Sequence, residues 1–111
     1  MTRVVVKKSA LTGITLISTE GHSGYAQEGR DIVCAAVSSA NELVINILES
    51  FSADISLDID AEKAYFCCKV LQTENNSKKK DELQRIAKGY VKFIGDLADA
   101  YHEYLKISTE V

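Results

Sequence analysis

Hydrophobic and polar residues near the N-terminus follow a strand-like pattern that later gives way to a helical one. Residues 3–8 (RVVVKK) and 13–20 (GITLISTE) are rich in β-branched side chains, and the segment 9–13 between them ends in Gly13. Two such segments joined by a short glycine-containing turn predict a β-hairpin. From 32 to 51 the apolar side chains recur every three or four residues. That spacing predicts an amphipathic helix.

The second half of the chain begins with another pair of predicted strands. Residues 54–60 (DISLDID) and 63–72 (KAYFCCKVLQ) combine strand-forming side chains with a tight link between them. In the first segment Ile55, Leu57 and Ile59 alternate with polar residues. Because successive side chains of a strand point to opposite faces, we expect one face of this strand to be buried and the other to be solvated.

A second long helix and a last strand complete the predicted fold. The polar segment 73–80 (TENNSKKK) predicts a break, after which apolar residues from Leu83 to Tyr101 recur at helical spacing. The tail, 104–111, returns to alternation and favours a final strand. We therefore predict an α+β fold, with a mostly antiparallel sheet of four to five strands and two helices on one face. The expected order is strand, strand, helix, strand, strand, helix and a possible strand, in a single domain over 1–111.

The amino-acid composition indicates what kind of protein this is and which binding partners are expected. The apolar fraction of 46% and charged fraction of 26% are typical of a globular chain, and the net charge of −3 argues against broad contact with nucleic acid. We find neither a signal-peptide pattern nor an apolar run close to the roughly 20 residues of a membrane helix, so no membrane partner is expected. Cys34, Cys67 and Cys68 cannot all pair within one chain. Reduced thiols, and hence a cytoplasmic location, are the expectation.

The stretch 21–40, GHSGYAQEGRDIVCAAVSSA, gathers three of the six glycines, one of two histidines and one of three cysteines. Gly21, Gly24 and Gly29 would let this loop adopt unusual backbone angles or approach a ligand closely. A connector that simply needs such turns is the plainer interpretation. The spacing matches neither a P-loop nor a dinucleotide-binding motif, so nucleotide binding has no support.

A more specific pattern lies where this loop meets the predicted helix. Asp31 is a favoured N-cap residue, and a helix that begins after it would place Cys34 in its first turn. Unpaired N–H groups and the helix dipole favour a thiolate there, which makes such cysteines nucleophilic. Eleven residues lie between His22 and Cys34, so a folded loop could bring an imidazole base to the sulfur. The alternative is a solvated histidine and a cysteine that only fills space.

Other polar residues near this site have two interpretations each. Ser38 follows Cys34 by one helical turn, where its hydroxyl could support the thiolate or simply bond back to its own helix. Asp31 could cap the helix alone or also orient His22. Neighbouring cysteines on a strand point to opposite faces, and His102 has no Cys or His three or four positions away. We therefore expect no metal site and no cofactor.

The segment GHSGYAQEGRDIVCAAVS resembles the signature of a bacterial family of ribosomal-processing cysteine proteases, called Prp. In that signature a Gly-His pair precedes a glycine-containing loop, and Cys-Ala-Ala-Val-Ser follows on a helix. Chain length and element order are also similar, over nearly all 111 residues. The resemblance implies that His22 and Cys34 are the catalytic pair. It also implies that Asp31 and Ser38 support this pair, and that the substrate loop contains Gly21, Gly24 and Gly29.

The resemblance also implies a reaction and partners. It implies an endopeptidase that removes a short N-terminal extension from a large-subunit ribosomal protein, cutting after phenylalanine and ahead of a basic stretch. It further implies a homodimer whose glycine loop orders around the substrate. Two alternatives remain open from the residues themselves. One is a noncatalytic ribosome-associated binding module, suggested by the lysines at 78–80, and the other is a thiol redox protein that uses Cys34 without a C-x-x-C motif.

Overall fold

The computed structural model describes residues 1–10, 13–27 and 29–111. The elements within these residues are β1 (Thr2–Ser9), β2 (Gly13–Glu20), α1 (Ile32–Ser50), β3 (Ile55–Asp60), β4 (Tyr65–Val70), α2 (Glu74–Lys78), α3 (Lys80–Ala100) and β5 (Leu105–Glu110). The predicted turn at 9–13 includes Leu11 and Thr12, which lie outside the described residues. The two predicted hairpins, the two long helices and the final strand are confirmed.

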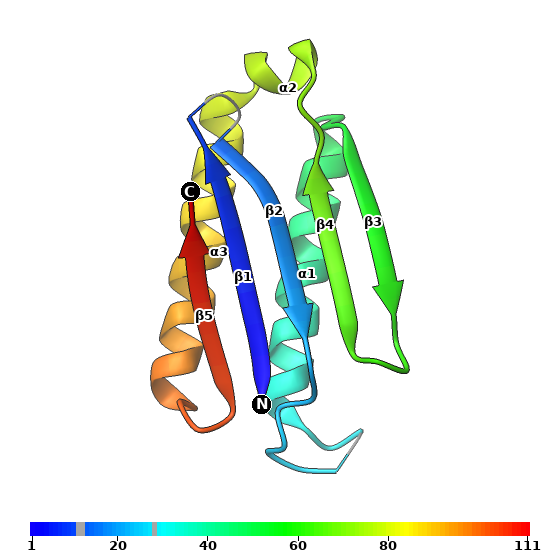
Figure 1. The fold of residues 1–111 in the computed structure, drawn as a ribbon, viewed down its shortest axis with the longest axis vertical. Helices are drawn as coiled ribbons and strands as arrows, with labels where there is room; N and C mark the ends of the chain where they lie inside the picture. The colour runs from blue at the N-terminus through cyan, green and yellow to red at the C-terminus, as the bar shows by residue number, and fades with distance from the viewer. Residues whose placement is uncertain (11–12, 28) are drawn as a thin grey trace.

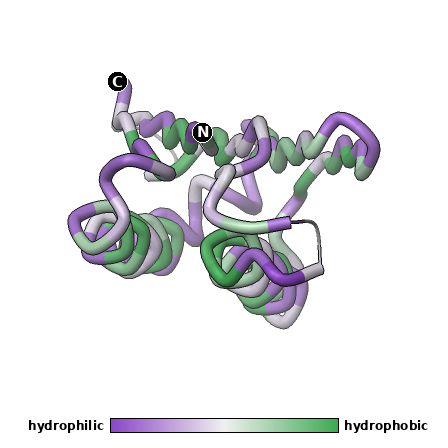
Figure 2. The backbone as a smooth tube through the Cα atoms, turned by 90° about the horizontal axis from the view of Figure 1, so that it is seen from below, coloured by the Kyte–Doolittle hydropathy of each residue, from purple (hydrophilic) through white to green (hydrophobic). Residues whose placement is uncertain are grey.

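The strands form one sheet in the order β3-β4-β2-β1-β5. All neighbouring strands are antiparallel except β1 and β5, which run parallel. Helices α1 and α3 lie side by side on one face of this sheet, as Figure 1 and the end-on view in Figure 2 show. The predicted α+β class and the placement of both long helices are therefore confirmed. The parallel β1–β5 pair makes the sheet mixed.

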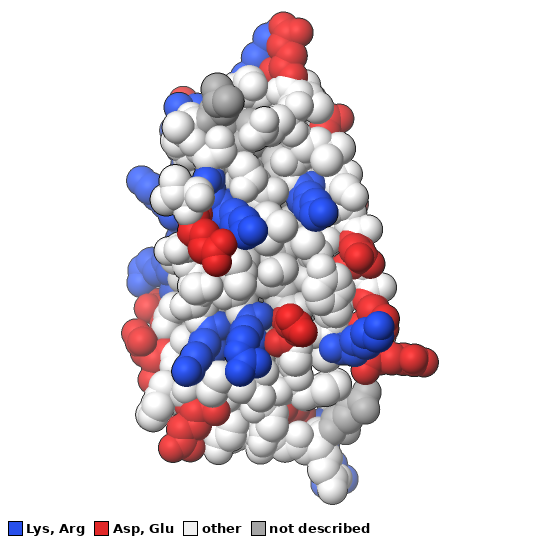
Figure 3. All heavy atoms as spheres, viewed as in Figure 1, with Lys and Arg blue, Asp and Glu red and all other residues white. Residues whose placement is uncertain are grey.

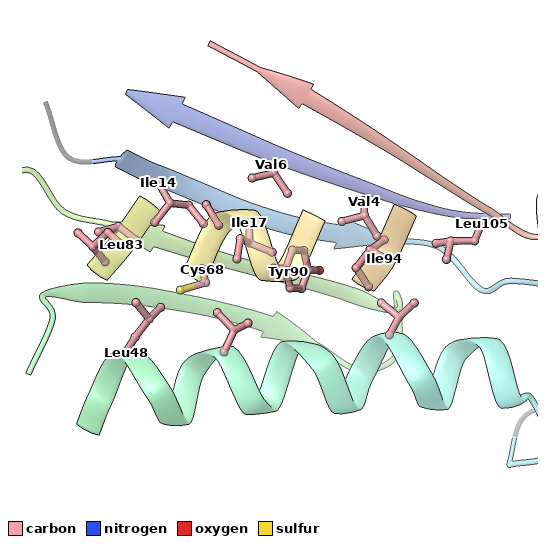
Figure 4. Packing of buried hydrophobic residues seen from close by; sticks show 14 of the residues in the cluster. Val4, Val6, Ile14, Ile17, Leu48, Cys68, Leu83, Tyr90, Ile94 and Leu105 are labelled. Atoms are coloured by element: carbon pink, nitrogen blue, oxygen red, sulfur yellow. The ribbon is translucent and has the colours of Figure 1, made fainter. Parts of the chain in front are cut away.

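The hydrophobic core fills the space between the sheet and the two helices. Strand side chains such as Val6 and Ile17 meet Leu48 from α1 and Tyr90 and Ile94 from α3, as Figure 4 shows. The fully buried positions of α1 recur every three or four residues, as the sequence pattern predicted. They are Val33, Val37, Asn41, Val44 and Leu48.

Helix α1 is long and apolar enough to span a membrane by length and composition alone. Uninterrupted apolar runs do not indicate this property of α1, because small and polar residues break the runs while the mean hydropathy of the helix stays high. One face of α1 packs against the sheet, and a second face lies beside α3. Because both of these faces are apolar, the mean hydropathy of the whole helix is high.

The expectation that β3 buries one face is wrong for two of its three apolar residues. Leu57 and Ile59 are exposed, the latter by 60%, and only Ile55 is half-buried. The reason is position, because β3 is an edge strand that pairs with β4 alone. The exposed apolar side of β3 becomes part of the candidate site described below.

The polar segment 73–80 is more ordered than the predicted break. It contains the short helix α2, which Thr73 caps by accepting a hydrogen bond from the Asn76 N–H at 3.1 Å. The Asn76 side chain is fully buried and bonds the backbone of Asp54, donating to its carbonyl and accepting from its N–H, both at 3.0 Å. Polar residues therefore hold this connection in place through specific hydrogen bonds.

The lysine run 78–80 is not simply a solvated helix start. Lys79 donates to the carbonyl oxygens of Phe51 and Ser52 at the end of α1, and its ammonium lies 5.6 Å from the centre of the Phe51 ring. Lys78 pairs with Glu74 at 3.5 Å on the exposed surface. At least Lys79 thus joins two helices, a structural role that charge patterning alone did not indicate.

The sheet face opposite the helices is open to solvent and carries both signs of charge. Figure 3 shows basic and acidic side chains scattered over this face among uncharged ones. Arg3 lies beside Glu20 on β2 and Lys106 on β5, and Lys7 pairs with Glu110 at 3.7 Å. No single sign of charge dominates this face.

Candidate active site

Asp31 starts helix α1, as the sequence predicted. Its Oδ1 accepts hydrogen bonds from the N–H groups of Val33 at 3.0 Å and Cys34 at 2.9 Å. This is the usual N-cap arrangement, in which a side chain satisfies N–H groups that lack a partner in the first turn. Cys34 consequently occupies the third helical position, half-buried. The cap fixes both the direction of the helix and the place of the sulfur.

The Asp31 carboxyl is buried and yet favours its charged form. Burial raises the pKa of Asp31, but hydrogen bonds from the Ser23 hydroxyl and from the backbone of Cys34 and Ala26 lower it more. The net pKa lies below the usual value for aspartate. Hydrogen bonds to a charged acceptor are stronger than those to a neutral one, so the Asp31 carboxylate holds the loop and the start of the helix together.

Ser23 connects the glycine loop to the start of α1, and sequence reasoning did not identify it. Its N–H donates to Cys34 Sγ at 3.3 Å, while its hydroxyl donates to Asp31 Oδ2. The Tyr25 N–H in turn donates to Ser23 Oγ at 3.2 Å, and Ser23 is only 2% exposed. The only sequence signal was its place directly after His22, which is too weak to assign these contacts.

His22, Cys34 and Ser38 line the same two adjoining pockets. One pocket, of about 430 Å³, lies under the glycine loop and is also bounded by Gly24 and Gly29. The other, of about 480 Å³, extends from these three residues toward the β3–β4 hairpin. The structure thus brings the predicted pair and Ser38 to one open cleft. Within the described part of the chain, His22 makes no side-chain hydrogen bond, so none joins it to Asp31.

The second pocket has an apolar wall and a polar floor. Its apolar wall comes from α1 and from the end of the β3–β4 hairpin, and includes Val37, Ile45, Ile59, Tyr65 and Phe66. Ile59 is one of the β3 residues that the helices leave uncovered. We call this space the hairpin pocket.

Asn41 lies on the floor of the hairpin pocket and is held by two buried hydrogen bonds. Its side-chain amide donates to Thr19 Oγ1 at 3.0 Å, and its carbonyl oxygen accepts from the Tyr90 hydroxyl at 2.6 Å. Burial raises the pKa of Tyr90, which keeps its hydroxyl protonated as a donor. This chain of hydrogen bonds joins β2, α1 and α3 behind the pocket, and buried polar networks of this kind hold a unique arrangement when every member is satisfied.

Gly21 sets the path of the loop that carries His22. Its φ is +90°, and a Cβ atom at this position would lie 2.6 Å from the Met1 carbonyl oxygen. The Gly21 N–H donates to the Ala64 carbonyl at 3.1 Å, and its own carbonyl accepts from Thr2 Oγ1 at 3.0 Å. Only glycine fits both the backbone angle and the space. The start of the loop is therefore tied to the chain's N-terminus and to the β3–β4 hairpin.

The far side of the loop rests on two tyrosines at and just beyond the end of α3. The Tyr25 ring meets Tyr101 and Tyr104 edge-on, with ring centres 5.5 and 5.3 Å apart. Such edge-to-face pairs add about 0.5–1.5 kcal/mol beyond simple burial. The loop is thus held at Gly21, Ser23 and Tyr25 in the free protein.

The remaining cysteines and histidine line neither pocket of this cleft. Cys67 and Cys68 are buried on β4, and burial raises the pKa of Cys68 to about 11. His102 is exposed beyond the end of α3. The described residues contain no group of three His, Cys, Asp or Glu side chains that could hold a metal ion. The side chains that line both pockets of the cleft are the imidazole of His22, the thiol of Cys34 and the hydroxyl of Ser38.

Comparison with solved structures identifies the fold. The structure of the ribosomal processing protease Prp from S. aureus with a covalently linked product peptide has a TM-score of 0.83 at 22% identity, covering 99% of this chain and 100% of that one. The same protease with a substrate peptide gives a TM-score of 0.78 at 20% identity, with the same coverage. The protein SMU.848 from Streptococcus mutans gives 0.80 at 23% identity, covering 99% and 94%. No curated protein sequence matches this chain.

The sequence itself carries the family assignment, because these structural likenesses alone establish only the fold. The family model described as cysteine protease Prp matches residues 1–106. That span includes both long helices, all of β1 to β4 and every residue of the cleft. The chain therefore belongs to the Prp family of cysteine proteases.

Proposed function

We propose that this protein is an endopeptidase in which Cys34 is the nucleophile and His22 the general base. The observation that carries the proposal is that both side chains line both pockets of one cleft, at the capped start of α1. Cys34 Sγ would bond to the scissile carbonyl carbon while its proton passes to His22. His22 would then give that proton to the leaving amine as the C–N bond breaks. Water would finally hydrolyse the thioester and free the thiol.

The proposed substrate is the N-terminal extension of a large-subunit ribosomal protein. In support, the structural relative from S. aureus is described as an essential ribosomal processing protease and was solved with substrate and product peptides. The hairpin pocket, at about 480 Å³ and with a largely apolar wall, suits an aromatic side chain such as the phenylalanine expected before the cut. Glu42 also lines this pocket and would attract the basic stretch expected after it.

The state of the loop and of the thiols fits this proposal. We propose that the substrate displaces the loop at Gly24, where a Cβ atom would meet open space. The contacts of Ser23 and Tyr25 would then restore the closed form. All three cysteines are free, in keeping with the reducing cytoplasm as the proposed location.

A peptide assay tests the substrate proposal. A synthetic peptide with an aromatic segment, a single phenylalanine at the expected site and a following basic run is incubated with the full chain. Mass spectrometry should show one cut, after that phenylalanine. Changing it to alanine should lower kcat/KM by about tenfold to 100-fold, because burying a phenylalanine side chain contributes about 1.5–3 kcal/mol. Alanine at an upstream aromatic position is the control. Equal cleavage of all three peptides would refute the pocket assignment.

We further propose that two copies of the chain associate through the groove between α1 and α3. This groove, of about 600 Å³, is lined mainly by apolar residues of both helices. Leu43 and Phe93 border it and are 59% and 49% exposed. Large apolar side chains gathered on one face favour a protein interface, and a second copy can cover the same patch by two-fold symmetry.

Substitution in this groove tests the dimer. Phe93→Glu places a charge in the proposed interface and should convert a dimer to a monomer at micromolar concentration, as measured by sedimentation velocity. Lys92→Glu adds a carboxylate at the adjacent exposed position, outside the groove, and should remain dimeric. A monomeric wild-type protein, or a dimeric Phe93→Glu variant, would contradict the proposed interface.

A further inference from the structure

Attack by Cys34 on a peptide carbonyl would create a negatively charged oxygen that needs hydrogen-bond donors. Backbone N–H groups in the first turn of α1 lie beside Cys34 and are the first candidates for this task. In the structure those groups are already engaged. Val33 and Cys34 donate to the Asp31 carboxylate at 3.0 and 2.9 Å, and Ala35 donates to the Asp31 carbonyl at 3.0 Å.

Using these N–H groups for catalysis would mean opening the helix cap. Loss of an N-cap costs about 0.5–2 kcal/mol, and here it would also remove two of the hydrogen bonds that the buried Asp31 carboxylate accepts. Transition-state stabilisation works best when donors are already in position and need no reorganisation. The first turn of α1 does not meet that condition.

The glycine loop supplies a donor whose hydrogen bond is made to the reacting sulfur and not to the helix cap. The Ser23 N–H points at Cys34 Sγ from 3.3 Å, and Ser23 is 2% exposed. We propose that this N–H stabilises the oxyanion of the tetrahedral intermediate. The oxyanion would be bonded to the same carbon as the sulfur, so a donor aimed at the sulfur needs only a small reorientation to reach it. This inference rests on the proposed function.

The Ser23 side chain explains why the donor is held in place. Its hydroxyl donates to the Asp31 carboxylate and accepts the Tyr25 N–H at 3.2 Å. The Ser23 hydroxyl is thus a positioning group, and the Ser23 N–H acts on the reacting atoms. Because this N–H belongs to the peptide bond between His22 and Ser23, the base and the oxyanion donor would move as one unit when the loop opens.

An amide-to-ester exchange tests the role of the N–H without touching the side chain. Semisynthesis of the full chain replaces Ser23 by its α-hydroxy analogue, which keeps the hydroxymethyl group and removes the N–H. We expect kcat for the peptide described above to fall by about 100-fold to 1000-fold with little change in KM, the usual effect of losing one oxyanion donor. The same exchange at Gln27, an exposed residue of the same loop, is the control and should retain activity.

Ser23→Ala separates the two roles of this residue. It keeps the N–H and removes the hydroxyl, so we expect a smaller loss in kcat, of about tenfold, the size of one hydrogen bond to a charged group. If the ester variant kept wild-type kcat while Ser23→Ala lost activity, the side chain alone would matter and the N–H would have no part in the reaction.

A measurement on the unmodified chain covers the case in which the ester variant fails to fold. A peptide aldehyde adds the Cys34 sulfur to its carbonyl carbon, and the resulting oxygen occupies the place of the oxyanion. The Ser23 amide proton should shift downfield in the NMR spectrum and exchange more slowly with solvent when this adduct forms. An unchanged Ser23 signal would overturn the inference, as would full kcat in a folded ester variant. A wild-type chain that cuts no peptide would instead refute the proposed function and this inference with it.

Discussion

Replacing Cys34 by alanine is expected to reduce kcat/KM for the phenylalanine-containing peptide by about 10⁴-fold or more, the scale on which loss of a nucleophile acts. Among the described residues that line the cleft, Cys34 carries a thiol and lies in the first turn of α1. Ser38 lines the same pockets, but its hydroxyl lies one helical turn further along. Product formation is followed by chromatography, with circular dichroism to verify that the variant is folded.

The other cysteines provide a matched control for this substitution. Cys67→Ala removes a thiol of β4 that lines neither pocket and contacts the hairpin pocket only through the Tyr65 side chain, so activity should stay within about twofold of the wild type. Iodoacetamide should block activity in step with modification of Cys34. Cys68 should stay unlabelled, because it is buried and its pKa is about 11. Cleavage by Cys34→Ala at more than a tenth of the wild-type rate would exclude it as the nucleophile.

Local sequence rules predicted the parts of the site that lie within one element. Asp31 was predicted to cap α1 and Cys34 to lie in its first turn, and the cap hydrogen bonds confirm both. These predictions succeed because an N-cap depends on residues only two or three positions apart. The spacing of apolar residues likewise predicted both long helices and the buried face of α1.

Contacts between residues far apart in the sequence could not be predicted from such local rules. The Ser23 N–H meets Cys34 across eleven positions, and Tyr25 meets Tyr101 across most of the chain. The exposure of Ile59 follows from the place of β3 at the sheet edge. Strand order and loop path decide all three features, and neither leaves a periodic signal in the sequence.

The structure also weakens the main reason for considering a noncatalytic ribosome-binding module. That alternative depended on the lysines at 78–80, whose charges would have to be free to meet phosphates. Lys79 instead donates to two carbonyls at the end of α1, and Lys78 pairs with Glu74. Together with membership of a cysteine protease family, this favours catalysis at the cleft over binding through the lysine run.

His22→Ala is the second substitution with a large expected effect. General acid–base catalysis contributes about 10²-fold to 10⁴-fold, so we expect kcat/KM to fall by about 1000-fold. The imidazole is exposed and makes no hydrogen bond to another described side chain, so the folded state should lose little stability. His102→Ala removes the other histidine of the chain, also exposed, and should leave activity unchanged.

Added imidazole distinguishes a proton-transfer role from a merely structural one. A free base that enters the vacated space beside Cys34 should restore part of the activity of His22→Ala, and the restored rate should increase with pH as the added imidazole becomes neutral. A loop that had lost its shape would gain nothing from imidazole. If His22→Ala instead retains kcat/KM within threefold of the wild type, another group must act as the base. His22 and Cys34 would then line the same two pockets without forming a catalytic pair.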